Sequence, residues 1–81
     1  MTIDYTPLNK TIDQLVSIHR GDATIAEVCM RVLTDLTEFG CVDELAMQHG
    51  IDMTVYDDRQ STFDQLVDAY VTQRVHKRLI A

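Results

Sequence analysis

The sequence predicts a small all-α protein: a single-domain bundle of about four helices, three longer and one short, with an irregular acidic loop before the last helix. Apolar residues recur at three- and four-residue spacing along most of the 81-residue chain, which is the period of a helix rather than of a strand. Helix start and stop signals divide the chain into four segments. A chain of this length forms one domain, here residues 1–81.

The first predicted helix has two candidate starts. Thr6 followed by Pro7 has the order of an N-cap and a first helical residue, whereas Thr11 with Gln14 three positions later forms a capping box. Both starts remain open, and Gly21 ends the helix in either case. The residues that share the apolar face of this helix are Leu8, Ile12, Leu15, Val16 and His19.

The second predicted helix has the clearest boundaries. Thr24 forms a capping box with Glu27, and Gly40 suits the left-handed conformation that ends many helices. Glu27, Arg31 and Asp35 recur at four-residue spacing on the side opposite the core, which predicts a salt-bridged, solvent-exposed face. The apolar stripe contains Ile25, Val28, Cys29, Val32, Leu36 and Phe39.

The rest of the chain predicts a short helix, a loop and a long helix. The short helix covers about residues 42–49, and residues 50–61 have no helical period. The long helix is expected to open at Ser61, with Asp64 as its capping partner. Its long apolar face would also support a homodimer. That face contains Phe63, Leu66, Val67, Tyr70, Val71, Val75 and Leu79.

The charge distribution bears on partners more than on fold. The chain has a net charge of -6, and between Val32 and Asp58 it contains seven carboxylates and no Lys or Arg. A stretch of this kind repels nucleic acid and attracts basic protein surfaces. Two apolar residues within it would serve as anchors. The predicted partner-binding set is therefore Asp35, Glu38, Asp43, Glu44, Asp52, Met53, Tyr56, Asp57 and Asp58.

These features predict a non-enzymatic interaction protein that binds a positively charged surface of another protein. In one form it is an inhibitor that occupies a nucleic-acid-binding groove, with carboxylates where phosphates would lie. In size and charge the chain is similar to small acidic helical proteins of phages and mobile elements, some of which inhibit bacterial defence systems. A solvated acidic face without a partner is the competing explanation.

Residues 42–59 resemble a helix-turn-helix, which makes a DNA-binding regulator the second candidate. The resemblance consists of a short helix, a turn at Gly50 and a Thr-Val-Tyr opening of the second helix. Base-reading helices are flanked by Lys and Arg, because neutralised phosphates supply most of the affinity. Here three aspartates surround the lone Arg59, so direct binding to nucleic acid is disfavoured. A structural or assembly subunit is the third candidate.

No motif indicates catalysis, a cofactor or a metal. The chain has three glycines and no glycine-rich phosphate loop, so a substrate-sized cleft is hard to build and no enzyme is expected. Cys29, Cys41 and His49 lack the close ligand pairs of zinc sites. The aspartates of residues 52–58 lack the spacing and the closing glutamate of a calcium loop.

The sequence predicts a cytoplasmic protein. No apolar run approaches the roughly 18–20 residues that span a bilayer. The first ten residues lack the basic and apolar order of a secretory signal. Two cysteines fit this compartment as reduced thiols, with a Cys29–Cys41 disulfide as the alternative.

Overall fold

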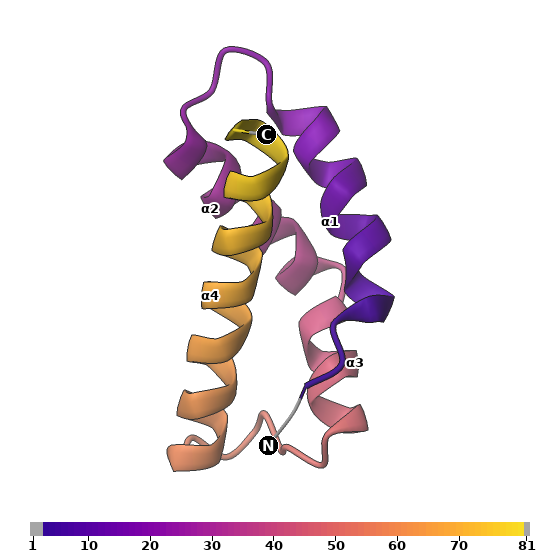
Figure 1. Cartoon of the computed structure of the whole chain (residues 1–81). Coiled ribbons are helices and arrows are strands. Elements are labelled where there is room, and N and C mark those ends of the chain that lie inside the picture. Colours follow the sequence, from indigo (N-terminus) through magenta and orange to yellow (C-terminus); the bar gives the residue numbers. More distant parts are fainter. Residues whose placement is uncertain (1–2, 81) are drawn as a thin grey trace.

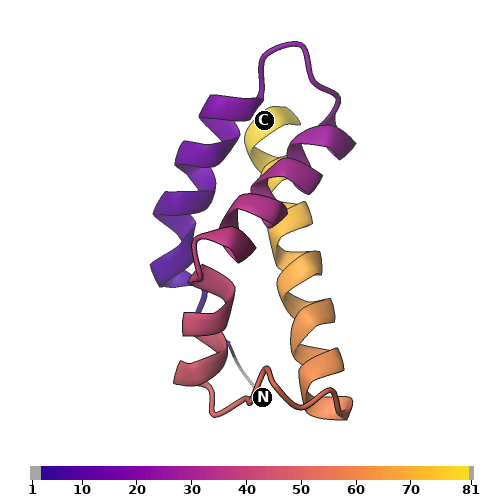
Figure 2. The same ribbon diagram turned by 180° about the vertical axis from the view of Figure 1, so that it is seen from behind.

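The computed structural model describes residues 3–80, which form four helices and no strand. These are α1 (Thr6–His19), α2 (Ile25–Glu38), α3 (Cys41–Gln48) and α4 (Asp58–Ile80). In Figures 1 and 2, α4 runs the full length of the molecule, and α1 and α2 lie beside its C-terminal half. Helix α3 continues from the end of α2 toward the end where α4 begins. The predicted all-α bundle with one short helix is confirmed.

The start of α1 shows which of the two predicted boundaries is used. The helix begins at Thr6, so Thr11 lies inside it, and Pro7 falls in the first turn. The backbone N–H of Thr6 donates to the carboxylate of Asp4 at 3.0 Å. The N-cap residue is Tyr5, whose side chain caps no amide, so the expectation that Thr6 is the N-cap is wrong by one position. Hydrogen bonding to Thr6 lowers the pKa of Asp4.

The limits of α2 agree with the prediction, but one residue of its apolar stripe does not. The hydroxyl of Thr24 accepts the N–H of Glu27 at 3.2 Å, and Gly40 has a φ of 76°, as expected for a left-handed C-terminal residue. Phe39 is 65% exposed, although its spacing had placed it on the core face. Phe39 is the C-cap residue of α2, and its N–H still donates to the carbonyl of Asp35, so it lies at the very end of the helix.

Helix α4 begins earlier than the capping signals indicate. The carboxylate of Asp57 accepts the N–H groups of Arg59, at 3.0 Å, and Gln60, at 3.1 Å. Asp57 therefore supplies the side-chain cap, and the prediction that Ser61 opens the helix is wrong. An aspartate is as good an N-cap as a serine. The acidic loop is shortened to residues 49–57, and Asp58 belongs to the first turn of α4.

The Asp57→Ala variant is expected to lose about 1 kcal/mol of stability, because two amide groups of α4 lose their acceptor. Urea unfolding followed by circular dichroism measures this loss. The matched control is Asp58→Ala, which removes a neighbouring carboxylate that accepts no hydrogen bond from the described residues and so should cost only a few tenths of a kcal/mol. Equal losses in the two variants would contradict the capping role of Asp57.

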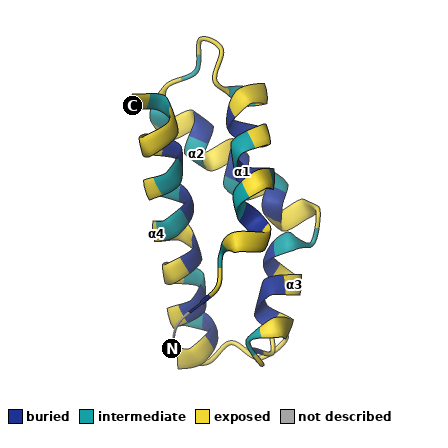
Figure 3. Cartoon of the chain, turned by 45° about the vertical axis from the view of Figure 1, so that its right-hand side comes forward, coloured by how far each residue is buried: buried dark blue, intermediate teal, exposed yellow. Residues whose placement is uncertain are grey.

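The core lies between all four helices, and buried positions follow their inward faces in Figure 3. The apolar face of α4 is covered within the chain, since α1 and α2 both pack against that helix. The surface expected to support a dimer is therefore largely occupied, while Leu66 is 40% exposed beside it. The buried apolar residues are Ile3, Leu8, Ile12, Leu15, Val16, Val28, Val32, Leu36, Val42, Leu45, Ala46, Ile51, Phe63, Val67, Val71 and Val75.

Polar and aromatic contacts join α1 and the segment before it to α4. The rings of Tyr5 and Tyr70 stack with centroids 3.8 Å apart, and the Tyr70 hydroxyl donates to the side-chain oxygen of Asn9. Farther along the contact between α1 and α4, the guanidinium of Arg74 donates two hydrogen bonds to the carboxylate of Asp13, at 3.0 and 2.9 Å. This two-point geometry fixes the relative position of the two helices more firmly than a single ion pair does.

Candidate protein-binding surface

Helix α3 is the element around which the predicted site residues gather. Gly40 before it and Gly50 after it have φ values of 76° and 68°, so the chain turns sharply at both ends. Three of its side chains, Val42, Leu45 and Ala46, are buried and hold it on the core. The residues left exposed are Asp43, Glu44, Met47 and Gln48.

An open hollow of about 540 Å³ lies between α3 and the loop that follows it. Asp43 and Met47, one helical turn apart, form its α3 side, and Met47 is 78% exposed. Ile51 is buried and Met53 packs against the core, so both help to form an apolar wall. We call this feature the loop hollow, and its lining residues are Asp43, Met47, Gly50, Ile51, Asp52, Met53 and Thr54.

The loop itself is held in place by its own polar groups. The carboxylate of Asp52 accepts the backbone N–H of Thr54 at 2.9 Å and the Thr54 hydroxyl at 2.6 Å. Both bonds favour the charged form and lower the pKa of Asp52, so this carboxylate stays negative in mildly acidic solution. Arg59 donates to the carbonyl of Gly50 at 3.0 Å, which ties the start of α4 to the end of α3.

Most carboxylates of the predicted acidic set form no ion pair with another described residue. Within residues 3–80, the ion pairs join His19 to Asp35, Arg31 to Glu27, and both Arg74 and Arg78 to Asp13. None of these pairs includes a carboxylate of α3 or of the loop. The residues of the predicted set that are exposed and not in these pairs are Glu38, Asp43, Glu44, Asp52, Asp57 and Asp58.

Asp35, a member of the predicted site, is mostly buried and paired with a residue of another helix. Its carboxylate lies 2.6 Å from Nε2 of His19, and both side chains are about three-quarters buried. The contact joins α2 to α1, so the expectation that Asp35 belongs to a solvent-exposed salt-bridged face is wrong. Glu27 and Arg31, by contrast, do form the expected pair at 3.8 Å.

Only some of the predicted apolar anchors and acids line the loop hollow. Asp43, Asp52 and Met53 meet in the loop hollow. Tyr56 is 79% exposed and is not among the residues that line the hollow. Asp57 is occupied as the cap of α4, although its charge remains on the surface. Met47, which is not in the predicted set, lies four residues from Asp43 on α3 and also lines the hollow.

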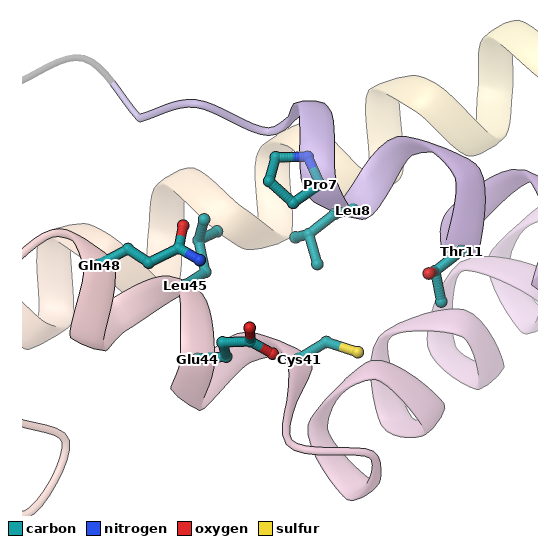
Figure 4. A pocket seen from close by; sticks show the side chains of 7 residues that line it. All are labelled: Pro7, Leu8, Thr11, Cys41, Glu44, Leu45 and Gln48. Carbon is teal, nitrogen blue, oxygen red and sulfur yellow. The ribbon is translucent and has the colours of Figure 1, made fainter.

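A second, smaller cavity of about 200 Å³ opens between α1 and α3 (Figure 4). Leu8 and Thr11 of α1 face Glu44 and Cys41 of α3 across it. Glu44 belongs to the predicted set, whereas the α1 wall had no sequence signal, because it depends on how two helices pack. We call this feature the α1–α3 pocket, and its lining residues are Pro7, Leu8, Thr11, Cys41, Glu44, Leu45 and Gln48.

Charge is separated along the molecule, which measures 37 Å in its longest dimension. The end of α3, the loop and the start of α4 lie together at the lower end of Figure 1, where carboxylates predominate. The C-terminal end of α4, with Arg74, Lys77 and Arg78, lies at the opposite end. The acidic surface is therefore remote from the chain's own cluster of cations.

The helix-turn-helix resemblance is not matched by the backbone. After α3, residues 49–57 are not helical, and α4 begins only at Asp58. The second helix expected after the turn at Gly50 is therefore replaced by the loop. The same residues form one side of the loop hollow instead.

Residues 3–80 contain no group of three or more His, Cys, Asp or Glu side chains placed to hold a metal ion. Cys29 and Cys41 are separate thiols, each half-buried. None of the helices described has the length and apolarity to cross a membrane. Comparison of the chain with protein-family models, with curated proteins and with solved structures finds no match.

Proposed function

We propose that the protein is a non-enzymatic interaction module that binds a positively charged surface of another protein through α3 and the loop of residues 49–57. The observation that carries this proposal is the composition of the loop hollow. Two carboxylates that form no ion pair with any described residue, those of Asp43 and Asp52, lie beside the exposed Met47 and the half-buried Met53.

Each part of the hollow has a role in binding. Methionine side chains are flexible and polarizable, so they adapt to the shape of an apolar partner group. The carboxylates supply electrostatic complementarity, which speeds encounter and rejects acidic surfaces. The hydrogen bonds from Thr54 hold the Asp52 carboxylate in position before the partner arrives, which lowers the entropic cost of binding.

In its narrower form, the proposal makes the partner a nucleic-acid-binding protein. Carboxylates on α3, in the loop and at the start of α4 would then stand where phosphates lie in the partner's natural complex. The support for this form is the concentration of unneutralised charge at one end of an elongated molecule. Such an inhibitor competes directly with nucleic acid for the partner's groove.

The test is a pull-down from nuclease-treated lysate of the source cells with tagged wild-type protein and with the double variant Asp43→Lys/Asp52→Lys. We expect a partner that elutes from the wild type at moderate salt and binds the variant at least roughly tenfold more weakly, equivalent to about 1.4 kcal/mol. Circular dichroism should show that both proteins keep the same helical content.

The matched control is Asp22→Lys/Asp68→Lys, which makes the same change in net charge at exposed positions outside the site that form no ion pair with a described residue. It should retain the partner. Equal weakening in both double variants would mean that net charge alone governs the interaction, and no weakening in either would leave the acids as a solvated face. Recovery of duplex DNA alone, from untreated lysate, would favour the DNA-binding alternative.

A further inference from the structure

We infer that the α1–α3 pocket receives a lysine side chain of the basic partner. This inference rests on the proposed function, and it assigns a specific contact to Glu44 that the loop hollow does not include. Glu44 follows Asp43 directly in α3, so adjacent residues of one helix present carboxylates to two separate depressions.

The size and lining of the pocket suit a chain of methylene groups. Its volume is about 200 Å³, somewhat more than the roughly 150 Å³ of an apolar cavity that accepts benzene. Pro7, Leu8 and Leu45 provide apolar surface, and Leu8 points into the space between the helices in Figure 4. A lysine side chain can bury its aliphatic stem on such a surface while its charged end stays near water.

The polar groups of the same pocket suit the ammonium group at the end of that stem. The carboxylate of Glu44 and the side-chain carbonyl of Gln48 are acceptors one helical turn apart on α3, and the hydroxyl of Thr11 lies toward the other end of the pocket in Figure 4. None of these side chains has a hydrogen bond to another described residue. The three N–H donors of an ammonium can turn toward acceptors in different directions, whereas the planar fork of arginine favours a coplanar pair.

Nuclear magnetic resonance with an acetylated and amidated tetralysine peptide as the probe tests this inference. We expect nuclear Overhauser contacts between lysine methylene protons and the methyl groups of Leu8 and Leu45. The isosteric variant Glu44→Gln removes the charge and should weaken peptide binding roughly two- to fivefold and reduce the intensity of these contacts. The control Asp22→Asn, which removes an exposed carboxylate outside the pocket and outside the predicted partner-binding set, should preserve both.

The outcomes separate this inference from the proposed function. If the peptide shifts the resonances of Asp43, Asp52 and Thr54 without any contact to Leu8 or Leu45, the pocket assignment is overturned while the acidic interaction surface stands. If Glu44→Gln and Asp22→Asn weaken binding equally, or if the peptide does not bind, the pocket assignment is also overturned. The pull-down with Asp43→Lys/Asp52→Lys then decides the proposed function independently.

Discussion

The Phe63→Ala variant is expected to lose about 3–5 kcal/mol of stability. Phe63 is fully buried and is among the largest side chains in the core. Its removal deletes apolar contact area and leaves a cavity that the surrounding helices fill only in part. A domain of 81 residues has a total stability of roughly 4–12 kcal/mol, so this single substitution removes at least about a quarter of it.

Urea unfolding at 25 °C, followed by the helical signal in circular dichroism, measures this loss. Leu66→Ala is the control on the same helix. Because Leu66 is 40% exposed, its substitution should lower the stability by less than about 1 kcal/mol. The difference between the two variants tests which face of α4 is turned inward. A loss for Leu66→Ala as large as that for Phe63→Ala would contradict the packing of α4 described above.

The Asp13→Asn variant is expected to lose about 2 kcal/mol of stability at pH 7, and this loss should disappear in strongly acidic solution. The two hydrogen bonds from Arg74, together with the charges of Arg74 and Arg78, hold the pKa of Asp13 below its usual value. A carboxylate whose pKa is lowered by folding stabilises the folded state fully above its unfolded pKa, near 3.9. That contribution is lost as the pH falls through the lower folded value.

The measurement is the free energy of unfolding of the wild type and of Asp13→Asn between pH 7 and pH 2. The wild type should approach the variant as the pH decreases below about 4. The control is Asp68→Asn on α4, because the Asp68 side chain is exposed and forms no ion pair with a described residue. A constant difference between wild type and Asp13→Asn at all pH values would contradict the assigned charge interaction.

The boundaries predicted correctly from the sequence depend on residues close together in the chain. Thr24 and the amide it caps are three residues apart, and Gly40 needs only its own backbone freedom to reverse the chain direction. The errors occur where two local signals compete or where a pattern is extended past its end. Ser61 and Asp57 are both suitable caps, and only Asp57 receives the N–H groups that start α4.

The candidate site was predicted only in part, because only some of its residues are close together in the sequence. Asp43 and Met47 share a helix face, so their proximity follows from helical spacing, whereas Asp52 joins them only because the loop turns back beside α3. Asp35 was misassigned because its partner, His19, lies on another helix, 16 residues away in the sequence. The α1–α3 pocket likewise depends on the packing of two helices, which no short sequence pattern specifies.

The separation of charge along the molecule has a kinetic consequence. A body 37 Å long with carboxylates at one end and Arg74, Lys77 and Arg78 at the other carries a permanent electric dipole moment. In the field of a basic partner, that dipole turns the α3 end forward before the two surfaces touch, which increases the fraction of collisions that are productive. Added salt shortens the range of this torque to a Debye length of about 8 Å at 0.15 M ionic strength. Association should therefore slow with ionic strength more strongly than dissociation accelerates.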